Sequence, residues 1–253
     1  MNQKQDLQII SILGQTQMGY TRPFVCRASD GRIYIVKTLG LMPYKQLIAE
    51  YLGGLIATEL GLLIPEFQLM TIKSDIYKLL SPKQKRDLTN TTVFSSLLIE
   101  NTSLAKFEQV YQALSEEEQK TIYFFDRWIN NSDRSSSLLG TGNINLLYDP
   151  INVKVYLIDH NLAFSNLEDK RTMDDEFSVH IFSQQHRAWS FSQEDKKKLT
   201  SQAKKIIQKL DLFFDSIPFE WHDEDSDLFE DYLKHITQIL KRIENDEFWE
   251  EFK

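Results

Sequence analysis

The sequence predicts an α+β fold of two lobes: a small β-rich N-terminal lobe with one helix, and a larger helical C-terminal lobe. Strand-forming segments dominate the first part of the chain, and helical spacing of apolar residues dominates the second. The composition supports a folded core, because 42% of the 253 residues are hydrophobic and 12% are aromatic. We place the boundary at residue 100, so the expected domains are 1–100 and 101–253.

The first lobe is predicted to begin as an antiparallel meander. Three segments are rich in β-branched and aromatic residues, namely 7–13, 23–27 and 32–37. Asp30-Gly31 is a hairpin signal between the last two. Pro43 then precedes apolar residues at helical spacing, which predicts a helix that ends at Gly61. A short helix and a loop are expected over 74–92, between two further strands at 65–72 and 93–99.

The second lobe is predicted to be mostly helical, with one small hairpin. Ser115 and Glu118 form the capping-box pattern, which marks the start of a helix. Helical spacing returns after residue 174, and the acidic stretch 222–231 is expected to be a solvated loop and helix start. Two short strands joined by Asp-Pro form the hairpin, at 144–148 and 153–158.

Charge and cysteine content narrow the class of protein. The chain carries 29 Lys and Arg against 37 Asp and Glu, a formal charge of −8, which argues against broad nucleic-acid binding but leaves a local basic groove open. One cysteine, Cys26, excludes a disulfide framework and indicates a reducing, intracellular compartment. No apolar run approaches the roughly 20 residues of a membrane helix, and the polar N-terminus lacks a secretory signal. We therefore expect a cytoplasmic protein that does not bind membranes.

Two carboxylates flank the small hairpin of the second lobe. Asp133 falls in the loop before it, Asn143 lies at the head of its first strand, and Asp159 follows its second strand. If the hairpin closes, these side chains converge on one edge and offer the oxygen ligands that suit Mg²⁺. A lone loop Asp more often caps a turn. The combination, however, favours phosphoryl transfer, since Mg²⁺ completes its shell with phosphate and water.

Two features of the first lobe fit the same chemistry. Lys37 closes an apolar strand and Glu50 lies near the buried face of the following helix, where a carboxylate needs a cation. The alternative is that Lys37 extends into solvent. The turn 15–21 contains Gly19, and its backbone N–H groups could hold a phosphate, although an ordinary hairpin turn is the commoner interpretation.

A strand Lys, a helix Glu, a loop Asp, an Asn and a later Asp follow the order of catalytic parts in protein kinases. In detail the sequence resembles the HipA-like kinases, which are atypical bacterial serine/threonine kinases. The stretches that carry the resemblance span residues 19–221: 19–23 with 30–37, 50–57 with 60–66, 125–134, 143–147 with 157–160, and 217–221.

The resemblance implies a protein-kinase-like fold and a role for each residue. Asp133 would be the catalytic base, with Arg134 beside it in the catalytic set. Lys37, also assigned to catalysis, would hold the nucleotide's phosphates and be oriented by Glu50. The segment 93–101 would read adenine through its backbone. The other residues expected to bind nucleotide are Gly19, Tyr20, Thr21, Ile99 and Glu100.

The metal ligands implied by the resemblance are Asp159 and an asparagine. The family places its Asn closer to the Asp, whereas here the residues 135–142 form an insertion after Asp133 and Arg134. Asn143 and Asn145 are therefore rivals, and we prefer Asn143 because the segment after it would then form the strand. The Ser and Thr residues of the insertion could be autophosphorylated. His160, where common kinases have Phe, is expected to be structural.

We therefore expect an ATP- and Mg²⁺-dependent kinase of the bacterial cytoplasm that phosphorylates a protein Ser or Thr. ATP and a protein substrate are the expected partners, an antitoxin or regulatory protein is a further candidate, and no direct nucleic-acid binding is expected. One alternative is a small-molecule kinase of the aminoglycoside or sugar type, which the acidic stretch 222–231 would suit. The other is a nucleotide-binding pseudokinase that binds a partner, which the insertion would suit.

Overall fold

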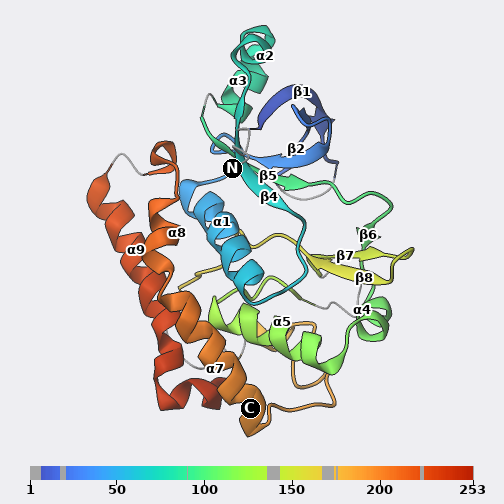
Figure 1. Cartoon of the computed structure of the whole chain (residues 1–253), viewed down its shortest axis with the longest axis vertical. Coiled ribbons are helices and arrows are strands. Elements are labelled where there is room, and N and C mark those ends of the chain that lie inside the picture. The colour runs from blue at the N-terminus through green and yellow to red at the C-terminus, as the bar shows by residue number, and fades with distance from the viewer. Residues whose placement is uncertain are drawn as a thin grey trace, which may run out of the picture. The chain divides into compact units, whose positions relative to one another are not determined.

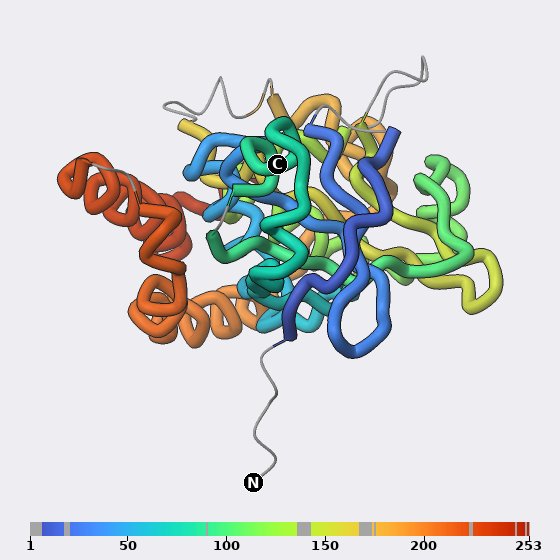
Figure 2. The backbone as a smooth tube through the Cα atoms, turned by 90° about the horizontal axis from the view of Figure 1, so that it is seen from above, coloured from blue at the N-terminus to red at the C-terminus, as the bar shows by residue number. Residues whose placement is uncertain are grey.

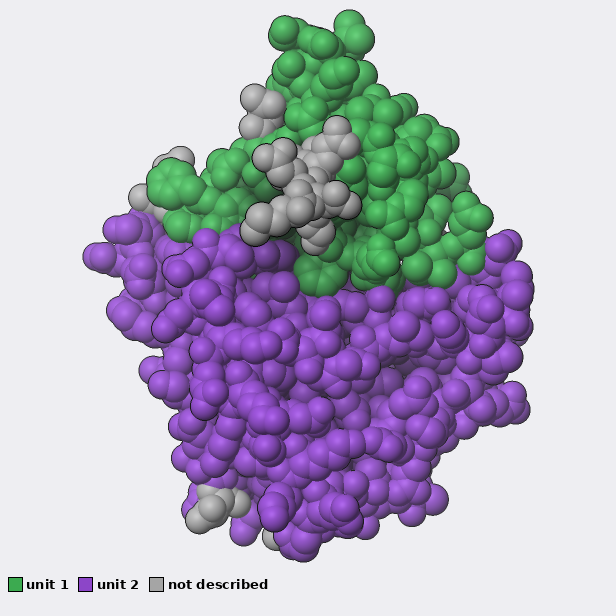
Figure 3. All heavy atoms as spheres, in the orientation of Figure 1, with its two compact units in different colours: residues 1–48, 65–100, 217–224 green, residues 49–64, 101–216, 225–253 purple. Residues whose placement is uncertain are grey.

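The computed structural model mixes helices and strands along the chain (Figure 1). It describes residues 7–17, 21–89, 91–135, 143–166, 174, 176–222 and 225–252. The chain divides into two compact units (Figure 3), of which unit 1 comprises residues 1–48, 65–100 and 217–224, and unit 2 comprises residues 49–64, 101–216 and 225–253.

Unit 1 is built on a closed barrel of five strands in the order β1-β2-β3-β5-β4. The strands are β1 (Gln8–Gln15), β2 (Phe24–Ala28), β3 (Ile33–Lys37), β4 (Phe67–Ile72) and β5 (Val93–Leu97). The predicted meander corresponds to β1, β2 and β3, which can be followed as adjacent blue tubes in Figure 2. Gly31 lies in the left-handed region at φ +83° in the turn between β2 and β3, as the hairpin signal requires. The sequence pattern did not predict that β1 pairs in parallel with β4 to close the barrel.

The interior of the barrel is filled by apolar residues that alternate along the strands. Cys26 lies in this core, fully buried, and burial raises the pKa of its thiol to about 12. The thiol therefore stays protonated at neutral pH and packs as a small apolar side chain. The buried residues of the cluster are Ile9, Phe24, Cys26, Ala28, Tyr34, Val36, Met70, Ile72, Leu88 and Val93.

The helices of the first hundred residues differ from the prediction of one helix. Within the described part of this stretch there are three: α1 (Tyr44–Glu59), α2 (Ser74–Leu79) and α3 (Pro82–Leu88). The polar segment 74–92 forms two short helices because Pro82 fits the first turn of α3 but could not continue α2. The predicted end of α1 at Gly61 agrees with the structure, where that residue has φ +76°.

A segment from late in the sequence returns to unit 1. The short 3₁₀ helix η1 (Phe219–Trp221) places the fully buried indole of Trp221 so that its Nε1 donates to the carbonyl of Thr92 at 2.7 Å. The hydroxyl of Thr92 donates in turn to a carboxylate oxygen of Glu220 at 3.1 Å. The stretch 217–221, which contributes to the family resemblance, is thus fastened to the segment just before β5.

Unit 2 is mainly helical and also holds a three-stranded sheet in the order β6-β7-β8. Its strands are β6 (Ser103–Leu104), β7 (Leu146–Asp149) and β8 (Lys154–Leu157). Residues 49–59 of α1 also belong to unit 2. Its other helical elements, within the described residues, are α4 (Phe107–Ala113), α5 (Glu116–Trp128), α7 (Gln193–Ile207), α8 (Leu210–Asp215), α9 (Ser226–Lys241), η2 (Arg242–Glu244) and η3 (Asp246–Phe252). No helix in the described ranges combines the length and apolar composition needed to cross a bilayer.

Helix α5 forms the centre of unit 2. The Nε1 of Trp128, whose side chain is fully buried, donates to the carbonyl of Leu240 at 2.8 Å, which fixes α5 against α9. The ring of Phe124 stacks on those of Trp128 and Trp249, with centroids 5.6 and 5.5 Å apart. The predicted hairpin is present as β7 and β8, although β7 starts two residues later and ends one later than predicted, and β8 is one residue shorter at each end. The first strand begins at Leu146 rather than at residue 144, because Asn145 has φ +47° and cannot continue an extended strand.

Removal of the cap of α5 provides a test of the sequence signal. Ser115 accepts from the backbone N–H of Glu118 at 3.3 Å, and the Glu118 carboxylate accepts from the backbone N–H of Ser115 at 2.8 Å. We expect Ser115→Ala to lower the free energy of unfolding by about 1 kcal/mol, because one helix-end N–H loses its partner. Denaturant titration measures the change. Ser201→Ala on the exposed face of α7 is the control and should change stability by less than about 0.5 kcal/mol.

Candidate active site

The loop that carries Asp133 is folded back onto the end of α5. The backbone N–H of Asn131 donates to the carbonyl of Asp126 at 2.8 Å, and Asn130 adopts φ +53° where the chain leaves the helix. The N–H of Ser135 then donates both to the carbonyl of Asp133 at 2.9 Å and to that of Asn143 at 3.1 Å. These bonds hold Asp133 in a tight turn with its side chain half-buried.

Both candidate asparagines point their amides at the same oxygen of Asp133. The Nδ2 of Asn145 donates to Oδ2 of Asp133 at 2.7 Å, and the Nδ2 of Asn143 donates to that atom at 3.2 Å. Asn145 is buried, whereas Asn143 is exposed. Because Asn145 also donates to the Asp133 carbonyl at 3.4 Å, it is the amide that holds the loop.

Asp159 lies close to this pair. The residue before it, Ile158, donates its N–H to the carbonyl of Asn145 at 3.1 Å, and Asp159 itself has φ +60°. The pKa of Asp133 is raised, first by partial burial and then by the negative charge of Asp159, and these causes outweigh the hydrogen bonds from the two asparagine amides. Two carboxylates and two amides therefore lie together at one edge of unit 2.

Glu50 and Gly53 on α1 pack against the turn that follows Asp159. A carboxylate oxygen of Glu50 accepts from the backbone N–H of His160 at 2.6 Å. A Cβ placed on Gly53 would lie 2.6 Å from the Cβ of His160, so the helix approaches this turn as closely as glycine permits. His160 is buried, with its ring edge-on to that of Phe125 at 5.4 Å. These contacts agree with the structural role expected for His160.

Arg134, which the resemblance places in the catalytic set, is held among buried partners. Its guanidinium is fully buried, and its Nε donates to Oδ2 of Asp126 at 2.7 Å. Its Nη1 donates to the carbonyls of Asn145 and, at 3.4 Å, of Ile158. The side chain therefore ties together the three segments that carry Asp133, Asn145 and Asp159. The contacts of its guanidinium in this structure are with these segments and with Asp126.

The partners of Arg134 form a buried network that the sequence analysis did not assign. Asp126 accepts from Nδ2 of Asn131 at 2.9 Å and from Nε2 of His180 at 3.0 Å, in addition to its ion pair with Arg134. Complete burial alone would raise the pKa of Asp126, but the charge of Arg134 and the bonds from His180 and Arg134 lower it to about 2. The sequence feature that could have indicated this network is Asp126 itself, a charged residue among the apolar residues of α5 between Phe125 and Trp128.

His180 completes the network as a neutral ring. Its Nδ1 accepts from the backbone N–H of Phe182 at 3.0 Å, so the hydrogen must reside on Nε2, which donates to Asp126. Burial lowers the pKa of His180, which keeps it uncharged at neutral pH. The backbone of His180 also bridges to Ser135, which connects the network to the first residue of the insertion. Residues 136–142 of that insertion lie outside the described residues.

The described nucleotide-binding candidates other than Glu50 belong to unit 1. Lys37 ends β3 opposite Phe94 of β5. Thr21 is half-buried before β2, and Ile99 and Glu100 follow β5. Gly19 and Tyr20 lie outside the described residues.

The donor set of unit 2 fits Mg²⁺ better than a metal held entirely by protein. No group of three or more His, Cys, Asp or Glu that could hold a metal occurs within the described ranges. The two carboxylates Asp133 and Asp159 repel each other, as the raised pKa of Asp133 indicates, and a cation would relieve that repulsion. Mg²⁺ accepts one or two carboxylates and takes its other ligands from phosphate and water.

Disruption of the buried ion pair should strongly destabilise the protein. Asp126→Asn leaves the guanidinium of Arg134 buried without a counter-charge, so we expect the free energy of unfolding to fall by about 3–5 kcal/mol. Denaturant titration measures the loss. The double variant Asp126→Leu with Arg134→Met removes both charges and should recover much of the stability; equal losses in both variants would contradict the argument.

The same pair predicts how stability depends on acid. The pKa of Asp126 is about 2 in the folded protein and about 3.9 in an unfolded chain. Its contribution is therefore fully present above about pH 4 and is lost as the pH falls toward 2. Stability measured from pH 5 to pH 2.5 should fall less steeply in Asp126→Asn than in the wild type, since the variant lacks this titration.

The close approach at Gly53 gives a third prediction. In an exposed helix, Gly→Ala stabilises by about 1 kcal/mol, but Gly53→Ala should destabilise because the new methyl group meets the Cβ of His160. A double-mutant cycle with His160→Gly, read by unfolding, should show that removing this Cβ restores part of the loss. Additive effects of the two substitutions would refute the contact as the cause.

Comparison with known proteins identifies the family of this chain. The model of the HipA-like kinase family matches residues 9–252. Comparison with curated proteins gives no significant match. Among solved structures, the chain is similar to the Helicobacter pylori proinflammatory kinase CtkA, at 12% identity and a TM-score of 0.55, over 93% of this chain and 92% of that chain.

Two structures of CtTel1 give weaker similarity. The FAT and kinase domain matches at 13% identity, with a TM-score of 0.34, over 90% of this chain and 21% of that chain. The open conformation matches at 14% identity, with a TM-score of 0.35, over 90% and 11%. These scores carry no argument about the fold. The match to the family model over nearly the whole sequence is decisive: the chain belongs to the HipA-like kinase family.

Proposed function

We propose that this HipA-like kinase uses ATP and Mg²⁺ to phosphorylate a Ser or Thr hydroxyl of a protein in the cytoplasm. The observation that carries the proposal is the convergence of Asp133, Asn143, Asn145 and Asp159 at one edge of unit 2. Phosphoryl transfer requires a positioned base and oxygen ligands for Mg²⁺, and it requires little covalent chemistry from the protein.

Asp133 is the proposed catalytic base. Partial burial and the nearby charge of Asp159 raise its pKa, and this makes the carboxylate a better proton acceptor. In the proposed reaction, Asp133 accepts the proton of the substrate hydroxyl as that oxygen attacks the γ-phosphorus of ATP. The bond between the γ-phosphorus and the β–γ bridging oxygen breaks, and ADP leaves with that oxygen. The buried Asn145 holds Asp133 by its carboxylate and its carbonyl.

Asn143 and Asp159 are the proposed ligands of Mg²⁺. The exposed Asn143 can turn its amide oxygen to a cation, whereas the buried Asn145 is committed to Asp133. When bound, Mg²⁺ would neutralise the charge of the phosphates. The two asparagines, which the sequence left as rivals, thus receive separate roles: Asn145 positions and Asn143 coordinates.

The nucleotide-binding roles rest on the family resemblance. We propose that residues 1–100 bind nucleotide and that residues 101–253 carry the catalytic and metal-binding loops. Lys37 would hold phosphate oxygens through its charge, and Glu50 would orient it. The remaining proposed contacts to nucleotide are Gly19, Tyr20, Thr21, Ile99 and Glu100. A regulatory or antitoxin protein is proposed as a further partner.

One observation favours a second candidate, a nucleotide-binding module without catalysis. Both asparagine amides donate to Oδ2 of Asp133, and these hydrogen bonds compete with proton acceptance at that oxygen. In this alternative the protein would bind ATP and melt at a higher temperature with it, but would release no ADP. Measuring ATP turnover beside the thermal shift separates the two candidates.

Replacement of the base tests the site directly. We expect Asp133→Asn to lower the rate of γ-phosphoryl transfer about 10²–10⁴-fold, since proton acceptance is lost. Transfer of labelled phosphate from ATP to a panel of proteins, aminoglycosides and sugars measures the rate and also identifies the acceptor class. Asp211→Asn, an exposed carboxylate on α8, is the control and should retain the wild-type rate. Full activity of Asp133→Asn would eliminate this base.

The rate should also depend on pH through Asp133. A base must be deprotonated to act, so kcat should fall on the acid side, with an inflection above the ordinary carboxyl pKa of about 3.9. Asn145→Ala removes a hydrogen bond that favours the charged form, so the inflection should move to higher pH. A pH–rate profile that is unchanged in this variant would contradict the role given to Asn145.

A further inference from the structure

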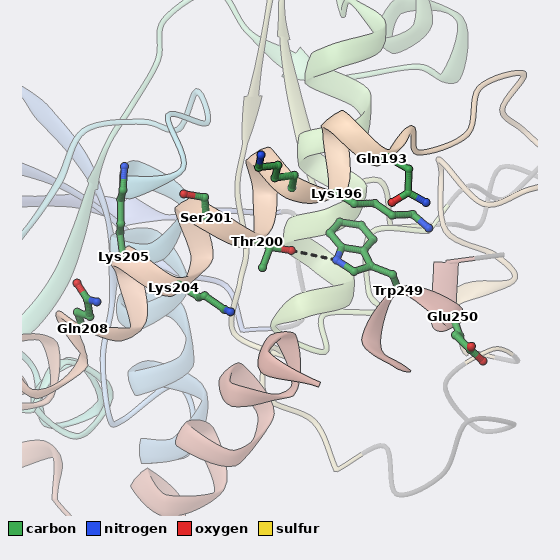
Figure 4. Close-up of a pocket in the computed structure, with 10 residues that line it drawn as sticks. Gln193, Lys196, Thr200, Ser201, Lys204, Lys205, Gln208, Trp249 and Glu250 are labelled. Atoms are coloured by element: carbon green, nitrogen blue, oxygen red, sulfur yellow. Dashed lines mark hydrogen bonds between the residues drawn. The ribbon is translucent and has the colours of Figure 1, made fainter. Parts of the chain in front are cut away.

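A groove in unit 2 lies outside the candidate active site. It has a volume of about 770 Å³ and runs along α7, where the C-terminal segment η3 forms its other side (Figure 4). Helix α7 contributes Lys196, Lys197, Lys204 and Lys205, and η3 contributes Trp249. None of these residues belongs to the loop, strand ends or network that position Asp133.

Among the residues that the structure describes, lysines outnumber acidic side chains in the lining of this groove. The side-chain ammonium groups of Lys197, Lys204 and Lys205 form no hydrogen bond or ion pair with any residue in the described part of the chain. Glu250 is the one acidic side chain that lines the groove within that part. By contrast, two lysines of the same region that face elsewhere are paired: Lys198 with Glu117, and Lys209 with Glu59 at 2.6 Å.

An aromatic side chain lies with the lysines. The Nε1 of Trp249 donates to Oγ1 of Thr200 at 3.0 Å, which fixes the indole on α7 midway between the lysine pairs in sequence. The ammonium group of Lys196 lies 5.8 Å from the indole centroid. The half-buried indole gives the groove an apolar part beside Lys196, while Lys204 and Lys205 extend to different sides of α7 farther along the helix (Figure 4).

The distance between the lysine pairs indicates how far apart the negative charges of a ligand should lie. The pair Lys196-Lys197 and the pair Lys204-Lys205 are eight residues apart, which is about 12 Å along a helix that rises 1.5 Å per residue. An extended peptide covers about 3.3 Å per residue, so about four of its residues span this distance. A peptide with two pairs of acidic residues, four positions apart, would place one pair near each lysine pair. An apolar residue between the acidic pairs would contact Trp249.

We propose that this groove binds an acidic segment of a partner protein in an extended conformation. The assignment rests on charge complementarity between an acidic ligand and the four lysines of the groove, which form a local positive cluster in a chain with a formal charge of −8. That net charge opposes the approach of a long polyanion such as a nucleic acid, whereas a short acidic peptide meets mainly the local field. The proposal does not depend on the proposed kinase chemistry.

A labelled peptide of the sequence Glu-Glu-Ala-Leu-Glu-Glu, titrated with the full-length protein, tests the proposal by fluorescence anisotropy. We expect saturable binding that weakens as salt rises. The double variant Lys204→Glu with Lys205→Glu should bind about tenfold or more weakly. The matched control, Lys198→Glu with Lys209→Glu, makes the same charge change on the paired lysines and should bind within about twofold of the wild type.

Three results would overturn the proposal: no binding of the peptide, equal loss in the control and groove variants, or tighter binding of a single-stranded oligonucleotide than of the peptide. Circular dichroism melting confirms that each variant is folded. Asp133→Asn should bind the peptide as the wild type does, so loss of activity and loss of binding can be distinguished. Trp249→Phe should weaken binding less than the charge reversal, because the ring remains.

Discussion

A positive charge that has no access to water must be neutralised by the protein itself, and the buried guanidinium of Arg134 imposes that condition on much of unit 2. Asp126 supplies the counter-charge from α5, and the backbone carbonyls of Asn145 and Ile158 accept from Nη1 of Arg134. The side chain next to the proposed base therefore fixes the helix, the hairpin and the turn at Asp159 relative to one another. Loop residues acquire a defined geometry because a costly buried charge requires these partners.

The same buried contacts explain how loop segments can hold the side chains of the candidate site in a defined geometry. The loop after α5 contains residues that favour turns, and Asn130, Asn145 and Asp159 all adopt positive φ. Such backbone positions are held only when the surroundings determine them strongly. Here the surroundings are buried: Asp126 and His180 lie beneath the loop, and Glu50 holds the turn after Asp159 from the side of α1.

Local patterns in the sequence predicted much of the fold. The three-stranded meander, the helix ending at Gly61, the capping box of Ser115 and the hairpin β7-β8 depend on residues close together in the chain. The parallel pairing of β1 with β4 and the contact of Asp126 with His180 join residues more than fifty positions apart, and no local period encodes them. The start of β7 was misplaced because a left-handed Asn145 and an extended one look alike in sequence.

The buried thiol of Cys26 provides a way to measure how often the barrel of unit 1 opens. A thiol that is fully enclosed and protonated does not react with alkylating reagents, so labelling requires the strands around it to separate. Because the chain has one cysteine, every labelling event reports the same local opening. The rate of modification in native buffer therefore gives the free energy of barrel opening independently of unit 2, where no thiol exists to compete.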